Sequence, residues 1–149
     1  MILWRISNHA SLAGNGALRA SGRWHTRGRR VVYCTESPAA ALLEILVHIE
    51  IDVRDLPVGY RLLKITAPHG LDVEQVDTGR LVPDWPRHVE TTRALGDGWL
   101  ARRSSALLKV PSAVVPETMN LLLNPSHPDA ARVSIARVSD HVVDSRLLR

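Results

Sequence analysis

The residues best suited to chemistry lie on one predicted helix. Ser37 is a good N-cap and Pro38 suits the first helical position, so a helix is expected from there through Ile49. The segment is apolar almost all the way round, which indicates packing on most sides. Its small and polar residues follow the i, i+4, i+7, i+11 spacing of one stripe, and they are Ser37, Ala41, Glu44 and His48. We expect this stripe to face a cleft, with a carboxylate at the edge of the core.

A carboxylate in apolar surroundings needs a cation or several hydrogen-bond donors, because burying it uncompensated is costly. Arg23, which follows the flexible Gly22, is the nearest candidate cation. The alternative is a solvated Glu44 that makes an ordinary i, i+4 contact with His48. The sequence leaves both interpretations open.

Composition indicates one globular domain. The chain has 149 residues, 45% of them apolar, and no apolar run approaches the length of a membrane span. Its N-terminus lacks the basic-then-apolar order of a signal peptide, so a cytoplasmic protein is expected. Cys34 is the lone cysteine, which permits no internal disulfide. The seven histidines are scattered, and no metal site is predicted.

The charge favours an anionic partner. The formal net charge is +4 and the pI is about 10.0, and the positive charge is nearly all arginine, which suits phosphate recognition. A biased genome composition would produce the same balance. A basic loop of Arg27, Arg29 and Arg30 suggests a nucleic-acid patch, although three arginines in a turn are more often simply solvated.

Short strands dominate the remaining pattern. They are expected at residues 2–6, 31–34, 60–65, 71–76, 105–110, 119–124 and 133–138. Residues 11–22, 52–59 and 83–86 are expected as loops, and residues 87–95 as a short helix broken at Gly96-Asp97-Gly98 before residues 99–102. Gly14-Asn15-Gly16 is not a dinucleotide fingerprint, because Arg19 occupies the third glycine position. The pattern predicts a single α+β domain with a mixed or mainly antiparallel sheet and a few helices.

An ordered series of short motifs covers nearly the whole chain. It comprises Trp4-Arg5-Ile6, Gly22-Arg23-Trp24, Val32-Tyr33, Ala41-Leu42-Leu43-Glu44 with His48, Gly96-Asp97-Gly98-Trp99, Val110-Pro111-Ser112, Asn120, Asn124-Pro125 with His127-Pro128, and Asp144-Ser145-Arg146-Leu147. The series resembles the RES domain, the toxin family of RES/Xre toxin–antitoxin pairs, which is named for an arginine, a glutamate and a serine. His25 departs from the family, which usually has asparagine after Gly-Arg-Trp.

The resemblance implies a fold like that of ADP-ribosyltransferases and an enzyme that consumes NAD as its substrate, with no further cofactor. Hydrolysis or phosphorolysis would deplete NAD, and transfer of ADP-ribose to a protein is the alternative. The implied partner is a cognate Xre-type antitoxin in an oligomeric complex that touches DNA only through the antitoxin. The family residues would be Arg23, Glu44 and Ser112, with Tyr33 and His48 lining the same pocket.

The chemistry of these residues agrees with NAD cleavage. Glu44 can stabilise an oxocarbenium-like state while it grips ribose hydroxyls. Arg23 can bind the pyrophosphate or a ribose-side oxygen while it neutralises Glu44. The ring of Tyr33 can pack on nicotinamide or ribose, and Ser112 can orient the substrate by hydrogen bonds without acting as a nucleophile. His48 either orients the carboxylate or is a satisfied supporting histidine.

Other residues receive structural roles. Trp24 is expected in the core, and Asn120 and Asn124 are expected as hydrogen-bonding residues at turns and strand ends. Two functions of other classes remain as alternatives. One is a basic RNA-binding or RNA-cleaving protein, and the other is a non-catalytic interaction module in which Glu44 and Arg23 are only a structural pair.

Overall fold

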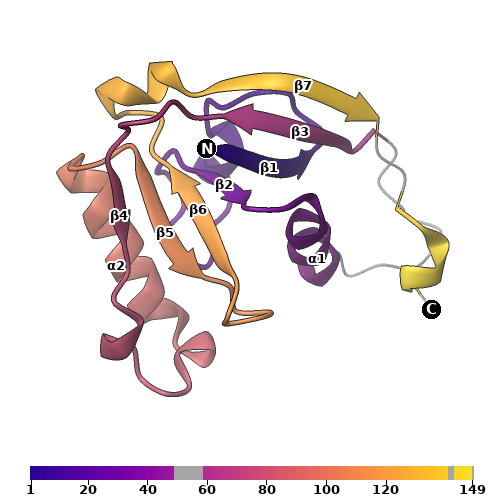
Figure 1. The fold of residues 1–149 in the computed structure, drawn as a ribbon. Helices are drawn as coiled ribbons and strands as arrows, with labels where there is room; N and C mark the ends of the chain where they lie inside the picture. Colours follow the sequence, from indigo (N-terminus) through magenta and orange to yellow (C-terminus); the bar gives the residue numbers. More distant parts are fainter. Residues whose placement is uncertain (49–58, 141–142, 149) are drawn as a thin grey trace.

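A seven-stranded sheet with two α-helices beside it forms the body of the molecule in the computed structural model, which describes residues 1–48, 59–140 and 143–148 (Figure 1). The strands are β1 (Ile2–Ser7), β2 (Val32–Thr35), β3 (Arg61–Thr66), β4 (Val73–Gln75), β5 (Leu107–Pro111), β6 (Met119–Leu123) and β7 (Ser134–Asp140). The helices are α1 (Pro38–His48) and α2 (Val89–Arg102). Short 3-10 helices span Asn15–Leu18, Thr78–Arg80, Trp85–Arg87, Pro128–Arg132 and Ser145–Leu148.

The sheet is mixed, which confirms the predicted α+β class. Its strand order is β4-β5-β6-β2-β1-β3-β7, and every neighbouring pair is antiparallel except β4 and β5. That pair can be parallel because α2 lies between the two strands in the chain and supplies the crossover that parallel pairing requires. All seven predicted strands are confirmed, and no strand end is shifted by more than two residues.

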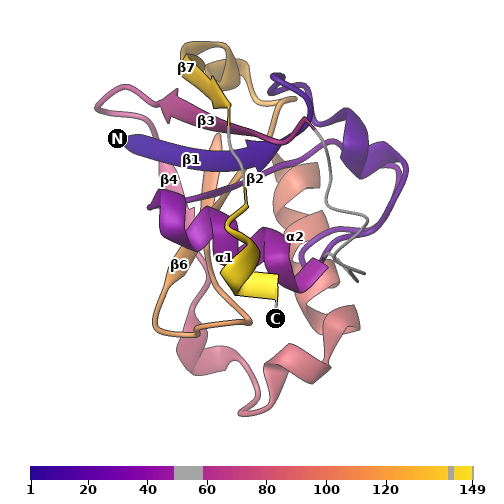
Figure 2. The same cartoon turned by 90° about the vertical axis from the view of Figure 1, so that its right-hand side faces the viewer.

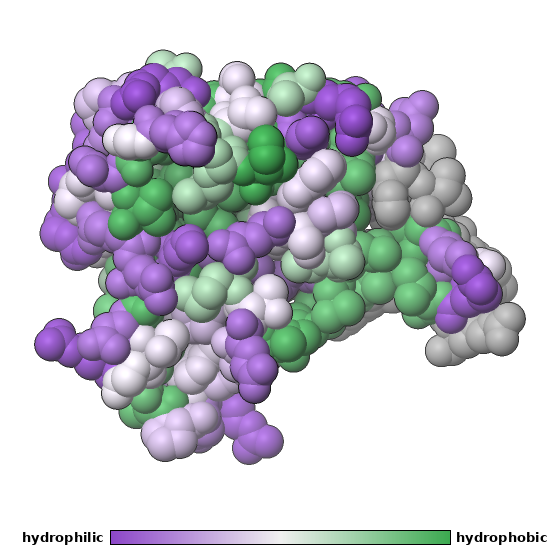
Figure 3. Space-filling view, in the orientation of Figure 1, coloured by the Kyte–Doolittle hydropathy of each residue, from purple (hydrophilic) through white to green (hydrophobic). Residues whose placement is uncertain are grey.

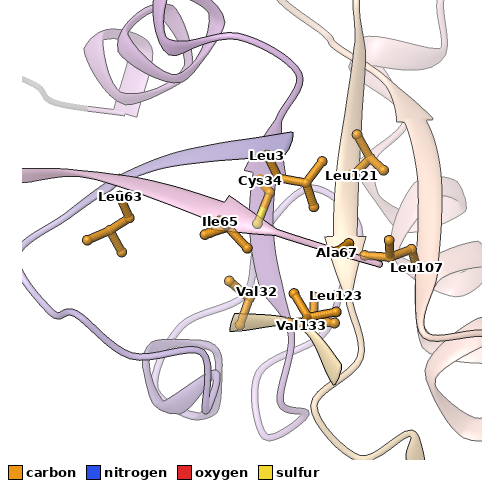
Figure 4. Packing of buried hydrophobic residues seen from close by; sticks show 10 residues of the cluster. All are labelled: Leu3, Val32, Cys34, Leu63, Ile65, Ala67, Leu107, Leu121, Leu123 and Val133. Carbon is orange, nitrogen blue, oxygen red and sulfur yellow. The ribbon is translucent and has the colours of Figure 1, made fainter. Parts of the chain in front are cut away.

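Each face of the sheet carries a buried hydrophobic cluster. Alternation along β2 sends Val32 and Cys34 to one face and Tyr33 to the other. The first core lies where the twisted sheet folds over itself (Figure 4), and its buried members are Leu3, Val32, Cys34, Leu63, Ile65, Ala67, Leu107, Leu121, Leu123 and Val133. The second core joins the opposite face to α2 through Trp99 and Leu100, and it contains Trp24 and Trp85. The sheet is thus a rigid support for side chains at its edges.

Helix α1 packs against β1 and β2, as Figure 2 shows from the side. Its start is confirmed, because the Ser37 hydroxyl accepts a hydrogen bond of 3.0 Å from the Ala40 amide. The predicted last residue, Ile49, and nearly all of the predicted 52–59 connection lie outside the described residues. The helix was expected to be packed on most sides, but Leu43 and Val47 are 41% and 55% exposed. That part of the prediction is wrong, since apolar character alone does not distinguish an unpartnered face from a buried one.

The prediction of a helix broken at Gly96-Asp97-Gly98 is also wrong. Helix α2 runs without interruption from Val89 to Arg102. Gly96 is buried against the backbone of Trp24, so its lack of a side chain serves close packing rather than a turn. Likewise, the expected loops around residues 11–22 and 83–86 contain the 3-10 helices Asn15–Leu18 and Trp85–Arg87. In the described part of the chain, no helix is long and apolar enough to cross a membrane.

The buried Cys34 thiol predicts a loss of stability in alkali. Burial raises its pKa from 9.0 to about 11. Above pH 9 the unfolded chain therefore releases this proton while the folded chain keeps it, so the free energy of unfolding falls as the pH rises from about 9 towards 11. Urea unfolding measures the free energy of unfolding of the native protein and of Cys34→Ala. The difference between the two free energies should shrink by about 2 kcal/mol between pH 8 and pH 11. A difference independent of pH would contradict this prediction.

Candidate functional site

A cavity of about 310 Å³ lies between α1, the ends of β1 and β2, and the loop that follows Ser21. Its polar and charged lining includes Arg5, Arg23, Tyr33, Glu44 and Asn120. The small Ala41 precedes Glu44 by one helical turn and also lines it. Two of the four residues of the predicted stripe, Ala41 and Glu44, therefore face a cleft. We call this space the Glu44 cavity.

Two side chains hold one oxygen of the Glu44 carboxylate. The Ser112 hydroxyl donates to Oε1 at 2.5 Å, and the Asn120 amide donates to the same oxygen at 2.8 Å. The amides of Val114 and Val115 donate to Ser112 Oγ at 3.1 and 3.2 Å, which directs the hydroxyl proton towards Glu44. No described residue donates to Oε2 of Glu44. One carboxylate oxygen is therefore fixed, and the other accepts from no side chain that the structure describes.

Arg23 lines the cavity but does not neutralise Glu44. Its Nη1 donates to the carbonyl of Pro86 at 2.7 Å, and its guanidinium lies 6.0 Å from the ring centre of Trp85. Within residues 1–48, 59–140 and 143–148, no ion pair joins Arg23 to Glu44. The expectation that Arg23 compensates the carboxylate is wrong, because Ser112 and Asn120 do so by hydrogen bonding.

Helix α2 is the platform on which the Arg23 loop rests. The Thr92 hydroxyl donates to the carbonyl of Arg23 at 2.6 Å, and Nε of Arg93 donates to the carbonyl of Gly22 at 2.8 Å. One turn later, the backbone of Trp24 packs directly on Gly96. Successive carbonyls of the loop are therefore tied to one face of α2, which fixes the position of Arg23.

The next contact comes from Asp97, which follows Gly96 on that face. Its carboxylate accepts hydrogen bonds from the amide and the hydroxyl of Thr26, at 2.9 and 2.6 Å. Arg29 forms an ion pair with the same carboxylate at 3.4 Å. Arg30 donates to the Ala13 carbonyl and to Asn15. Two of the three arginines in the basic loop are thus engaged in fixing the loop, and this weakens the nucleic-acid interpretation.

His25 and Tyr33 brace the loop from the other side. Nε2 of His25 faces the carbonyls of Ala17 and Ala20 at 3.2 and 3.0 Å, so this nitrogen carries the proton. Nδ1 is then the acceptor for the Gly22 amide at 3.1 Å and for the Tyr33 hydroxyl at 2.7 Å. Burial raises the pKa of Tyr33 well above its ordinary range, so the hydroxyl remains a donor. His25, where the family usually has asparagine, is therefore a buried brace.

The remaining predicted site residues have different outcomes. Trp24 is 2% exposed and belongs to the second core, as expected, while one side of it lines the cavity. Asn124 directly follows β6, and its amide donates to the Leu100 carbonyl at 3.2 Å, as expected for a hydrogen-bonding residue at a strand end. Asn120 is a hydrogen-bonding residue near the start of β6, as expected, and the acceptor of its amide is Glu44. The side chain of His48 lies outside the described residues, so its predicted place in the pocket stays a prediction.

Helix α1 also carries exposed apolar residues. In Figure 3 hydrophobic colour gathers over α1, where Leu43 and Val47 are exposed. Among the described residues, no group of three or more histidine, cysteine, aspartate or glutamate side chains is placed to hold a metal ion. The charged groups that line the Glu44 cavity are the carboxylate of Glu44, which two hydrogen bonds hold, and the guanidinium groups of Arg5 and Arg23.

Comparisons with known proteins agree on a family. A sequence profile described as the RES domain matches residues 2–144. A protein of Pseudomonas putida named Toxin Res is 51% identical over 147 residues, which cover 99% of each chain. A protein of Sphingobium sp. (strain YBL2) named Prs ADP-ribosylating toxin is 35% identical over 156 residues, covering 98% of this chain and 96% of that one.

A solved structure shares the fold. It is a chain of the crystal structure of the M. tuberculosis MbcT-MbcA toxin-antitoxin complex. The similarity covers 95% of this chain and 84% of that chain, with a TM-score of 0.71. At 18% sequence identity this is a likeness of architecture.

Proposed function

Because this chain belongs to the RES domain family, we propose that it is the toxin of a toxin–antitoxin pair and depletes NAD by cleaving the bond between nicotinamide and ribose. One observation carries the chemical part of the proposal. Ser112 and Asn120 fix Oε1 of Glu44, and the Glu44 side chain lines a cavity of about 310 Å³ in which Oε2 accepts from no described side chain. The names of the relatives support the toxin role.

The reaction needs stabilisation of positive charge on ribose. When the bond between C1′ and the pyridinium nitrogen breaks, its electron pair goes to nicotinamide, which leaves as a neutral base. The remaining ribosyl group has oxocarbenium character, which a fixed carboxylate stabilises without reorganising. An oxygen of the acceptor then bonds to C1′, and its proton is released to solvent. Glu44 supplies the carboxylate and can also accept a hydrogen bond from a ribose hydroxyl.

The acceptor separates two forms of the proposal. Water or phosphate as the acceptor makes the protein an NAD glycohydrolase or phosphorylase. A protein side chain as the acceptor makes it an ADP-ribosyltransferase that uses the same pocket, and the name of the Sphingobium relative supports this alternative. Arg23 would hold a ribose-side oxygen in either case, because α2 fixes its loop beside Glu44.

A cognate antitoxin is the proposed partner. The structure with the same fold comes from a toxin–antitoxin complex, and the family resemblance suggests an Xre-type antitoxin in an oligomeric assembly that contacts DNA through the antitoxin alone. The exposed apolar residues Leu43 and Val47 of α1 lie on the same helix as Glu44. A partner that covers them would contact the helix that carries Glu44.

The deciding experiment follows NAD labelled in its adenine ring. Purified protein is incubated with the label in buffer with and without phosphate, and then with cell extract. Free ADP-ribose indicates hydrolysis, ADP-ribose phosphate indicates phosphorolysis, and label on a protein indicates transfer. Intact NAD under all three conditions, together with unchanged cellular NAD after induction, would refute the proposal.

We expect Ser112→Ala and Asn120→Ala each to lower kcat/KM for NAD on the order of 10- to 100-fold. Each change removes one of the two donors that fix Oε1 of Glu44. Ser104→Ala is the matched control, because the exposed Ser104 hydroxyl donates to Glu74 in the same way but far from the cavity lining. Equal activity in Ser112→Ala and Ser104→Ala would show that holding Oε1 is unimportant.

A further inference from the structure

A second cavity, of about 470 Å³, lies beside the first. We call it the Arg19 cavity, and the loop between β1 and β2 forms most of its wall. Its charged lining residues in the described chain are Arg5 and Arg19, with no carboxylate among them. Polar side chains in the lining include Asn8, His9, Ser11 and Asn15. Such a lining favours a ligand that carries negative charge and several hydrogen-bonding groups.

The two cavities are neighbours that share part of their walls. Four residues line both spaces, and they are Arg5, Ser21, Gly22 and Tyr33. Gly22 is tightly enclosed there, since an added Cβ would lie 2.9 Å from Nδ1 of His25 and still closer to the Tyr33 hydroxyl. The boundary between the cavities is therefore made of fixed backbone, one aromatic ring and one guanidinium group.

Arg5 occupies this boundary because β1 and β2 separate there. Their register contains the single pair Trp4 and Thr35, and the Tyr33 carbonyl accepts instead from Nη1 of Arg5 at 2.8 Å. Nε of Arg5 is buried and has no hydrogen-bond partner in the described part of the chain. Among the same described residues, no carboxylate forms an ion pair with the Arg5 guanidinium. A buried guanidinium donor without an acceptor calls for an explanation.

We propose that the two cavities bind one dinucleotide, whose diphosphate lies at Arg5. The nicotinamide riboside would occupy the Glu44 cavity, and the adenosine half would occupy the Arg19 cavity. This inference rests on the proposed NAD cleavage and specifies how the substrate is held. Phosphate oxygens are the acceptors that a guanidinium binds most effectively, and they would satisfy Arg5. Arg19 would add a second positive charge on the adenosine side.

Cavity size supports the division. Ligand pockets typically measure about 300–1,000 Å³, so the Glu44 cavity of about 310 Å³ is at the lower limit for a whole dinucleotide. The Arg19 cavity supplies the remaining space. The other arginine that could bind the diphosphate, Arg23, lines only the Glu44 cavity, whereas Arg5 lines both cavities. Arg5 is therefore the better candidate for the diphosphate, and Arg23 for the ribose side.

The test compares Arg5→Gln with Arg19→Glu, and Arg27→Glu serves as the control. Arg19 and Arg27 are both exposed, so the two reversals change net charge equally, but Arg27 lines neither cavity. Steady-state cleavage is measured with NAD and with nicotinamide riboside, which lacks the diphosphate and adenosine. Calorimetric titration with ADP measures binding without any cleavage. Thermal melting checks that each variant is folded.

Arg5→Gln is expected to raise KM for NAD and Kd for ADP on the order of 10- to 100-fold, with kcat changed far less. Arg19→Glu should raise both constants several-fold, and Arg27→Glu should change neither. For nicotinamide riboside, Arg5→Gln should raise KM far less than it does for NAD. If NAD is cleaved and its KM is the same in all four proteins, the inference is overturned while the proposed function stands. If the native protein does not cleave NAD at all, the proposed function fails. The ADP titration then tests the inference by itself, because an unchanged Kd for ADP in Arg5→Gln would overturn it.

Discussion

Glu44→Gln is expected to lower kcat for NAD cleavage on the order of 10²- to 10³-fold while the protein stays folded. Glutamine has nearly the volume of glutamate, and its amide oxygen can still accept from Ser112 and Asn120. The substitution removes the negative charge that would face the developing positive charge on ribose. The loss should therefore appear in kcat, whereas KM and the melting temperature should change little.

The control for this variant is Glu36→Gln. Glu36 is an exposed carboxylate just before α1, where it forms an ion pair of 3.2 Å with Lys109. Its loss should leave NAD cleavage unchanged, because surface ion pairs contribute little and this residue does not line the Glu44 cavity. Glu44→Gln with more than a third of native activity would mean that the carboxylate has a structural role. A lower melting temperature with no change in chemistry would favour the non-catalytic alternative.

A double variant tests how Ser112 acts. Ser112 contacts the carboxylate, so its effect should pass through Glu44. Ser112→Ala should then cost little further activity in the Glu44→Gln background, although it lowers activity by itself. Equal losses in both backgrounds would instead place Ser112 in direct contact with the substrate. This cycle separates a positioning role from a binding role.

The position of Glu44 could be predicted from local sequence. A helix start at Ser37 and Pro38 sets the phase of α1, and the phase places Ala41 and Glu44 on one line. The strands were predictable for the same reason, since alternation of apolar and polar residues is a local signal. Such signals extend over about ten residues, which is enough for an element and for the face that it presents.

The partners of Glu44 could not be predicted in this way. Ser112 and Asn120 are 68 and 76 residues away in the chain, and the antiparallel pairing of β5 with β6 brings both to the carboxylate. Arg23 was the natural choice from sequence proximity, yet α2 and the Pro86 carbonyl hold it in another position. The family resemblance named Ser112, but the register of the sheet determines which atom it contacts.

Gly96 shows a second limit of sequence analysis. The run Gly96-Asp97-Gly98 has the composition of a turn, and glycine within a helix is unfavourable by about 1 kcal/mol relative to alanine. Helix α2 nevertheless continues through it, because close packing of Gly96 on Trp24 outweighs that local preference. Sequence analysis predicts the free-energy cost of a glycine within a helix. The packing that offsets this cost comes from Trp24, on a loop about seventy residues earlier in the chain.

The two glycines of α2 should consequently respond in opposite ways to alanine. At Gly96 an added Cβ would lie 2.7 Å from the carbonyl carbon of Trp24 and closer still to its oxygen, so Gly96→Ala should destabilise the protein by on the order of 3 kcal/mol. At Gly98 the nearest atom would be the flexible Arg102 guanidinium at 3.4 Å, so Gly98→Ala should stabilise by up to about 1 kcal/mol. Chemical denaturation measures both changes.

The same pair tests whether α2 positions the site. Gly96→Ala must push the Trp24 carbonyl away from α2, and that carbonyl lies between the hydrogen bonds that fix Gly22, Arg23 and Thr26. In the protein that remains folded at low temperature, kcat/KM for NAD should fall at least about 10-fold, because a small displacement of a positioning loop is costly. Gly98→Ala should retain native kinetics. Native kinetics in a destabilised Gly96→Ala would separate the two roles and show that the loop keeps its position without the close contact to α2.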